Sequence, residues 1–148
     1  MQSGSDRILN RMNRDYSKEE FVEISNRIRD ILPDVGISTD IIVGFPGETD
    51  TDFQDTMETM REIKFDSAYN FKYSPRRGTK ASEYDDQVNY DVKNERLEQI
   101  ISLQKKHTLE RNLSLIGSTQ KVLIEKESKL SKDQWAGRTD SNKWIMFD

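Results

Sequence analysis

The 148-residue sequence has no cysteine and only one histidine, His107. Without cysteine, these residues can form no disulfide framework, no thiolate-bound zinc or iron–sulfur site and no thiol nucleophile. One histidine excludes a histidine-rich metal site, and the neighbouring Lys105 and Lys106 in a helical pattern predict a surface position for it. The longest aliphatic run, 41–43, is far shorter than the roughly 20 residues that span a bilayer. We therefore expect no membrane partner, no bound metal and, by default, a cytoplasmic location.

Positive charge is also in deficit, with 23 lysines and arginines against 27 aspartates and glutamates, for a net charge of −4. The chain therefore has no overall positive field to attract nucleic acid, and any RNA contact must come from a local patch. Apolar residues make up 33% and charged residues 34% of the chain. This balance predicts a small core and a heavily charged surface.

The spacing of apolar residues predicts alternating helices and strands, followed by a small β segment. Capping-box patterns after Ser17 and Thr49 begin two of the helices. The expected helices cover 5–14, 18–32, 50–63 and 90–116, and the expected strands cover 35–43, 67–73, 121–125 and 144–147. The predicted apolar positions of the last helix are Val92, Leu97, Ile100, Ile101, Leu103, Leu109, Leu113 and Ile116.

Strand–helix alternation indicates parallel strands joined by right-handed crossovers, which is the α/β class. The continuous apolar run 41–43 predicts that its strand is buried on both faces, which two strands cannot provide. We therefore expect the chain to be a fragment of a larger fold. Its exposed edges would then promote self-association by strand pairing or swapping.

Two loops follow the predicted strands, where ligands bind in parallel α/β folds. The glycines of 44–49 allow close backbone approach, although a tight turn with a capping box explains this loop equally well. Loop 73–79 places Arg76 and Arg77 beside Tyr73, which suits an anion or a base, although a solvated turn is the simpler explanation. The basic character of Arg7, Arg11 and Arg14 also fits a solvated helix face. No carboxylate pair stands out for acid–base catalysis, so we expect no catalytic residue in this chain.

Several motifs occur together in a characteristic order. They are Gln2-Ser3-Gly4-Ser5-Asp6-Arg7, Met12-Asn13-Arg14-Asp15-Tyr16, residues 38–49 (STDIIVGFPGET), residues 73–79 (YSPRRGT) and Gly137-Arg138-Thr139. Together they resemble the radical S-adenosylmethionine (SAM) methylthiotransferases, and Phe65-Asp66-Ser67-Ala68-Tyr69 favours the MiaB type, which modifies tRNA. The resemblance covers nearly the whole chain.

The resemblance implies a partial (β/α) barrel fragment with parallel strands and flanking helices, followed by a truncated small β (TRAM-like) segment. Residues 1–116 would be the C-terminal half of the radical SAM barrel, and 117–148 the first part of a TRAM domain, an RNA-binding module. The parent enzyme would use SAM and 4Fe-4S clusters, held partly by a CxxxCxxC motif. It would add a methylthio group to carbon 2 of an N6-isopentenyladenosine beside the tRNA anticodon.

The resemblance also places a cofactor site and an RNA site on particular residues. The implied SAM contacts are Gln2, Ser3, Arg14, Asp40, Gly44, Tyr73, Ser74 and Arg76. The implied RNA contacts, in the anticodon stem-loop complex of the parent, are Lys121, Trp135, Arg138 and Lys143. Residues 117–148 hold six basic residues (Lys121, Lys126, Lys129, Lys132, Arg138, Lys143) against five acidic ones, which is a weak electrostatic footprint. Trp135 and Trp144 could both stack on bases, but core packing is expected for at least one.

The sequence departs from the family chiefly by lacking the cysteine triplet, so we expect that this chain alone binds no cofactor fully and is catalytically inert. Two alternatives remain. The chain could be a stand-alone RNA-binding module that uses its β segment, or a plain α/β interaction domain without catalysis.

Overall fold

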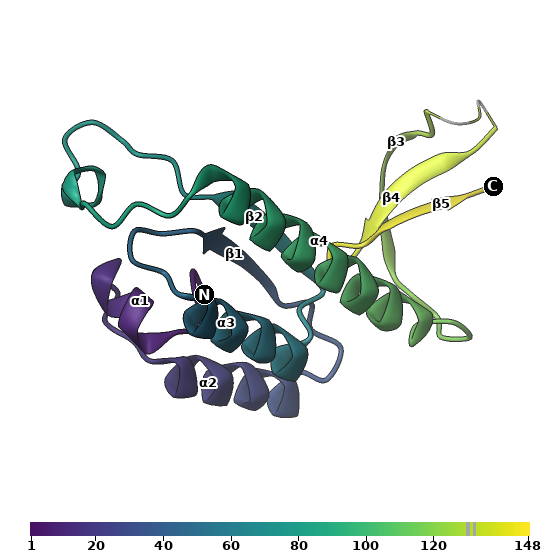
Figure 1. The fold of residues 1–148 in the computed structure, drawn as a ribbon. Helices are drawn as coiled ribbons and strands as arrows, with labels where there is room; N and C mark the ends of the chain where they lie inside the picture. The colour runs from purple at the N-terminus through teal and green to yellow at the C-terminus, as the bar shows by residue number, and fades with distance from the viewer. Residues whose placement is uncertain (130, 132) are drawn as a thin grey trace.

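The computed structural model describes residues 1–129, 131 and 133–148 (Figure 1). An α/β part comes first, and a small antiparallel sheet projects from the far end of its last helix. The elements are α1 (Asp6–Arg11), α2 (Lys18–Ile31), β1 (Ser38–Val43), α3 (Asp50–Ile63), β2 (Ser67–Lys72), a 3₁₀ turn (Lys80–Glu83), α4 (Tyr90–Leu113), β3 (Val122–Glu127), β4 (Trp135–Thr139) and β5 (Trp144–Phe147). The predicted mixed α/β class with a small β segment is confirmed.

Helix starts follow the predicted capping chemistry. The Ser17 side chain accepts from the backbone N–H of Glu20, whose carboxylate accepts from Ser17 in return. Thr49 and Asp52 form the same reciprocal box at α3. At its other end α4 stops at Leu113, three residues before the predicted end, because the chain continues to Gly117 in tighter turns.

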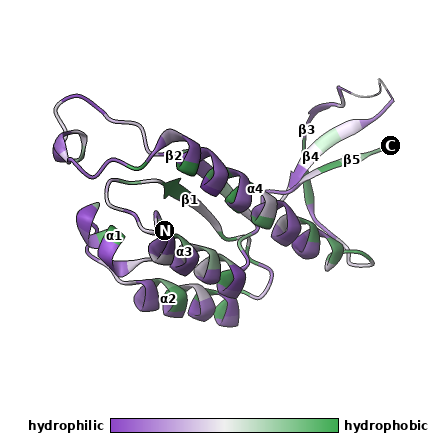
Figure 2. Ribbon diagram, viewed as in Figure 1, coloured by the Kyte–Doolittle hydropathy of each residue, from purple (hydrophilic) through white to green (hydrophobic). Residues whose placement is uncertain are grey.

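The core lies between the parallel pair β1–β2 and the helices. The strands pair in register from Ser38 opposite Ser67 to Val43 opposite Lys72. One face of the pair packs on the helices, and the buried apolar residues are Met1, Ile41, Val43, Phe53, Met57, Met60, Ile63, Phe65 and Ile100. The apolar character of β1 stands out against the polar surfaces of the helices (Figure 2).

The prediction that residues 41–43 are buried on both faces is wrong for this chain. Ile41 and Val43 are fully buried, but Ile42 is only half-buried and its β2 neighbour Phe71 is 52% exposed. Alternate residues of a strand point to opposite faces, so Ile42 and Phe71 share the face that no helix of the described residues covers. This open face forms part of the candidate site described below.

Helix α4 buries a stripe that is mostly polar, although an apolar one was predicted; of the predicted apolar positions, Ile100 is fully buried, and Leu97 and Leu103 pack against the core. Its buried residues, at spacings of three and four, are Lys93, Arg96, Ile100, Gln104 and His107. The predicted surface position of His107 is therefore wrong, because the residue is only 3% exposed. Burial lowers the pKa of its imidazole. Some of these buried polar groups bond to distant residues: the Gln104 amide, for example, donates to the Phe65 carbonyl at 2.9 Å.

The small sheet has the strand order β3-β4-β5, with antiparallel pairing throughout and a bulge between Ile124 and Lys126. Sequence patterning missed its central strand, because β4 contains Ala136 and Gly137 in place of an apolar alternation. Gly137 is required there, because a side chain would collide with the backbone oxygen of Leu123 on β3.

Candidate functional site

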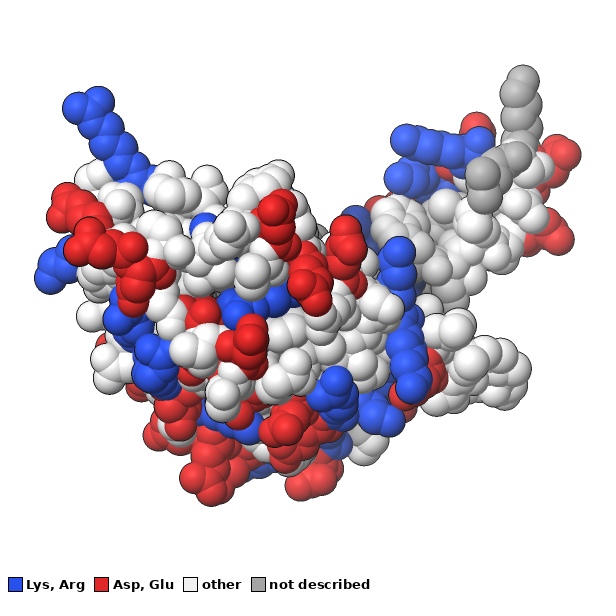
Figure 3. All heavy atoms as spheres, viewed as in Figure 1, with Lys and Arg blue, Asp and Glu red and all other residues white. Residues whose placement is uncertain are grey.

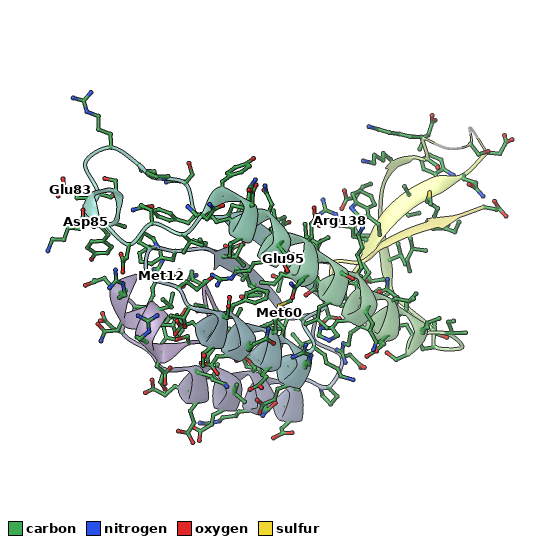
Figure 4. All side chains as sticks on the ribbon, in the orientation of Figure 1. Met12, Met60, Glu83, Asp85, Glu95 and Arg138 are labelled. Atoms are coloured by element: carbon green, nitrogen blue, oxygen red, sulfur yellow. The ribbon has the colours of Figure 1, made fainter. Side chains whose placement is uncertain are left out.

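A cleft of about 590 Å³ lies at the carboxyl ends of β1 and β2. Its size falls within the range of roughly 300–1,000 Å³ that is usual for small-molecule sites. Its lining includes six of the residues predicted to contact SAM, namely Gln2, Arg14, Asp40, Tyr73, Ser74 and Arg76. Met12, which ends α1 and is labelled in Figure 4, lines the same cleft. Segments far apart in the sequence thus meet at the place that the loop positions predict.

Gln2 is held at the cleft by β1 and by the segment before α2. The backbone N–H of Ile42 donates to the Gln2 carbonyl at 3.0 Å, so residues 1–3 run beside β1 on the edge opposite β2. The Tyr16 hydroxyl donates to the side-chain oxygen of Gln2 at 2.7 Å. This bond fixes the amide at the wall of the cleft.

The first loop is shaped by Gly44, which is not itself on the wall of the cleft. Gly44 has φ +68°, a left-handed conformation that favours glycine, and the Lys93 side chain fills the space that a Cβ would need. Its N–H donates to Glu48 Oε1 at 2.8 Å, which closes the turn. The turn presents the next residue, Phe45, to the cleft.

Two residues of α4, Arg96 and Lys93, hold the two loops of the cleft, one loop each. Arg96 donates to the Glu48 carboxylate at 2.7 Å, and both side chains are nearly inaccessible, at 6% and 2% exposure. Burial raises the pKa of Glu48, while the Gly44 N–H and Arg96 act against that rise. Lys93 reaches the second loop, with its Nζ 3.5 Å from the Tyr73 carbonyl and 5.2 Å from the centre of the Tyr73 ring.

Tyr73 links the second loop of the cleft to the first. Its ring meets Phe45 edge to face, with centroids 5.1 Å apart. Its hydroxyl oxygen is buried, and among the described residues it has no hydrogen-bond partner. Because this oxygen is closed to solvent, Tyr73 contributes to the wall of the cleft through its other atoms.

The charges around the cleft match the groups of SAM. Arg14 and Arg76 contribute cations and Asp40 a carboxylate, while Phe45 and Tyr73 give an aromatic wall. SAM combines a carboxylate, an ammonium group and an adenine, so the residues present fit part of it. A cavity of about 620 Å³ between β2 and α4 gathers no comparable set of charges, since Lys105 is the only one of its described lining residues with a charged side chain.

Not every predicted SAM contact faces the cleft. Ser3 is fully buried, and its hydroxyl bonds to Thr56 on α3 and to the backbone N–H of Ser5. Of the basic residues near α1, Arg7 pairs with Asp52 and Arg11 pairs with Asp86, whereas Arg14 lines the cleft. The structure therefore gives Arg7 and Arg11 structural partners.

The predicted RNA contacts do not share one face of the small sheet. Successive residues of a strand alternate between faces, so Trp135 and Arg138 lie on opposite ones. Trp135 shares its face with its cross-strand partner Phe147 and with Ile124 and Ile145. Trp135 is nonetheless 47% exposed, so this apolar face stays partly open and the RNA contact predicted for Trp135 stays a prediction. Lys121 is exposed just before β3, and Lys132 lies outside the described residues.

On the other face, a tryptophan ring lies between two basic side chains, an arrangement that the sequence alone did not single out. Trp144 lies opposite Arg138 in the pairing of β4 with β5 and is 51% exposed. Lys126 Nζ lies 4.5 Å and the Arg138 guanidinium 4.8 Å from the centre of the Trp144 ring. Arg138, labelled in Figure 4, also pairs with Glu125 at 2.8 Å. Basic side chains gather on the visible face of this sheet (Figure 3).

Lys143, the remaining predicted RNA contact, is turned toward the α/β part. Its Nζ lies 3.0 Å from Asp66 and 2.9 Å from the Asn112 side-chain oxygen, and the side chain is only 16% exposed. The structure thus places Lys143 at the junction of the two parts of the chain.

An iron–sulfur cluster does not fit the residues of this chain. The sequence offers no cysteine, and within the described residues no group of three or more histidines or carboxylates is placed to hold a metal ion. No helix in the described part of the chain has the length and apolar character needed to cross a membrane.

Comparisons with known proteins match two families in the order that the motifs predict. Residues 1–60 match the radical SAM superfamily, and residues 113–148 match the TRAM domain. The boundary predicted at residues 116 and 117 stays a prediction.

Three curated relatives are each named tRNA-2-methylthio-N(6)-dimethylallyladenosine synthase. The protein of Pelotomaculum thermopropionicum is 49% identical over 147 residues, which are 99% of this chain and 33% of the relative. That of Thermoanaerobacter sp. is 48% identical over 99% of this chain and 31% of its own length, and that of Clostridium tetani is 44% identical over 99% and 32%. The chain spans about a third of the length of these relatives. The resemblance to radical SAM methylthiotransferases of the MiaB type, with a radical SAM segment followed by a TRAM segment, is confirmed.

Proposed function

We propose that the chain provides one wall of the SAM site and part of the RNA-binding surface of a tRNA methylthiotransferase. The name that the relatives share supports N6-isopentenyladenosine as the modified nucleoside, with carbon 2 as the site of methylthiolation. The observation that carries the SAM part is the cleft, where Gln2, Arg14, Asp40 and Tyr73 converge from four separate segments.

The residues of the cleft suggest a division of roles toward SAM. Arg14 suits the carboxylate of SAM, because guanidinium and carboxylate form strong charge-assisted bonds. The Phe45–Tyr73 wall suits the adenine, and Ser74 and Arg76 lie at the same end of β2. Gly44 and Lys93 act behind the wall by holding its two loops in place.

Radical chemistry in this family comes from SAM bound to a reduced 4Fe-4S cluster. Because this chain supplies no cysteine ligand for such a cluster, we infer that it binds SAM weakly and does not cleave it by itself. The test is to measure 5′-deoxyadenosine after iron–sulfur reconstitution of the purified chain. No product is expected, and product formation would contradict this inference.

The RNA part rests on the Lys126–Trp144–Arg138 group. Base–aromatic stacking contributes about 1–3 kcal/mol per base, so Trp144→Ala should weaken binding of an anticodon stem-loop about 5-fold or more. Fluorescence anisotropy at low salt would measure this, with Lys105→Gln, an exposed change on α4, as the control. Equal affinities for Trp144→Ala and the parent would reject this face as the RNA site.

The same group favours the alternative of an RNA-binding module without SAM. That alternative predicts RNA binding together with no SAM binding in the cleft. Self-association through the edge of β2 that no described strand pairs with is a further proposal. Sedimentation across micromolar concentrations would test it, and a clean monomer would contradict it.

A further inference from the structure

Asp66 belongs to one of the motifs that carry the resemblance, but it lies far from the cleft. It comes immediately before β2, whereas the cleft is at the other end of that strand. The residue is only 7% exposed. Its carboxylate accepts from the backbone N–H of Ile37 at 3.0 Å, and its own N–H donates to the Ile37 carbonyl at 2.9 Å. These bonds fix the carboxylate rigidly to the entry of β1.

Three cations from three different elements surround this carboxylate. Lys143 Nζ lies 3.0 Å and Arg111 Nε 3.2 Å from the same oxygen, and Arg29 Nη2 lies 4.0 Å from the other. Arg29 comes from α2, Arg111 from α4 and Lys143 from the turn between β4 and β5. Burial acts to raise the pKa of Asp66, but the Ile37 bond and the cations outweigh it and lower the pKa. Asp66 is therefore an ionised anchor for the small sheet.

The turn that carries Lys143 is itself ordered and closely packed. Thr139 N–H donates to the Lys143 carbonyl at 3.0 Å, and Lys143 N–H donates to the Thr139 hydroxyl at 3.1 Å. On the other side, the carbonyl oxygen of Ser141 lies 2.8 Å from where a Cβ of Gly36 would be. A real Cβ could not occupy that position without moving the turn, so Gly36 permits the close approach.

Lys143 is followed directly by Trp144, whose ring is flanked by Lys126 and Arg138. The contact that joins the two parts of the chain is therefore one residue away from the aromatic surface proposed for RNA. We propose that Asp66 is a positioning residue: by accepting Lys143 across the junction, it sets the orientation of the β3–β5 sheet, and with it the Trp144 ring, relative to the cleft. The RNA part of this statement rests on the proposed function, whereas the junction itself does not.

The absence of cysteine makes the junction directly measurable. Glu23→Cys on α2 and Glu127→Cys on β3, both at exposed positions, accept one spin label each. Pulsed electron paramagnetic resonance then reports the distribution of distances between the two parts. Lys143→Met should broaden this distribution and Lys143→Arg should restore it. Gly36→Ala should shift or broaden it without any change of charge.

Glu110→Gln is the matched control, because Glu110 also pairs with a lysine, Lys64, at 3.1 Å, but within the α/β part. It should leave the distribution unchanged. The proposal is overturned if Lys143→Met and Gly36→Ala both give the narrow distribution of the parent.

RNA affinity separates this proposal from a direct phosphate contact. A positioning role predicts that Lys143→Met broadens the distances but changes stem-loop affinity by no more than about 2-fold, whereas loss of a phosphate contact weakens binding. An unchanged distribution with clearly weaker RNA binding would overturn the proposal and make Lys143 an RNA contact. If Lys143→Met broadens the distances but the parent chain binds no RNA, the positioning role of the Asp66–Lys143 contact is supported and the proposed RNA function is rejected.

Discussion

Replacing Arg96 by methionine tests whether α4 holds the first loop of the cleft through a buried ion pair. The change removes the cation that lies 2.7 Å from Glu48 and leaves a carboxylate that is only 2% exposed. It also removes the bond to the Glu48 carbonyl at 3.1 Å. The second ion pair of Arg96 contributes little, because its partner Asp50 is 94% exposed.

The expected cost follows from the burial of both partners. Removing one member of a buried ion pair typically destabilises a protein by about 3–5 kcal/mol. For a chain of this size, about 2–4 °C of melting temperature corresponds to 1 kcal/mol, so we expect a decrease of about 6–20 °C. Thermal unfolding followed by circular dichroism measures it. Lys64→Met, which breaks the exposed pair with Glu110, should change stability by no more than about 1 kcal/mol.

The stability deficit of Arg96→Met should also depend on pH, which gives a second test. Burial already raises the pKa of Glu48, and loss of Arg96 should raise it further. A carboxyl group with a raised folded-state pKa stabilises the fold at low pH and loses that contribution as the pH rises through the folded pKa. The deficit of Arg96→Met should therefore be smaller at pH 4 than at pH 8. A deficit below about 1 kcal/mol at pH 8, or one independent of pH, would refute the reasoning.

Three further predictions concern other parts of the fold. Burial acts to raise the pKa of Asp52, but its bonds from Arg7 and from neighbouring hydroxyls hold it well below the usual range. Asp52→Asn should thus cost stability at pH 6 and cost less as the pH falls below about 4, and a difference between parent and variant in urea denaturation that stays constant from pH 6 to 3 would contradict this. Phe65→Ala, at a fully buried side chain, should cost about 3–5 kcal/mol in the same assay. Gly44→Ala should cost at least about 1 kcal/mol, because φ is +68° and Lys93 fills the space, and an unchanged melting temperature would reject that packing.

Local chemistry was predictable from the sequence wherever it depends on neighbouring residues. The capping boxes at Ser17 and Thr49 follow from residue spacing, and the parallel pairing of β1 with β2 follows from strand–helix alternation. The cleft was predictable because loops after parallel strands meet at one edge of the sheet. Its lining by Gln2 and Arg14 came from the family resemblance, since nothing in their local pattern indicates a ligand.

The features that could not be predicted depend on distant partners. Periodicity assigns the buried side of α4 to leucines, but Arg96 and Gln104 are buried because Glu48 and the Phe65 carbonyl meet them. His107 lies on the same stripe and is buried with them. Likewise, the sequence could not show that Trp135 and Trp144 lie on opposite faces of the small sheet, because this follows from the pairing of β4 with β5.

The most direct test of the account is to titrate the isotopically labelled chain with SAM and follow backbone amide resonances. The account predicts weak binding, with shifts concentrated at Gln2, Phe45, Tyr73 and Ser74 in the cleft. Resonances along the β2–α4 cavity, such as that of Ile101, should stay in place. No shift at millimolar SAM, shifts confined to the β2–α4 cavity, or submicromolar affinity would contradict the assignment of this cleft as one wall of a SAM site.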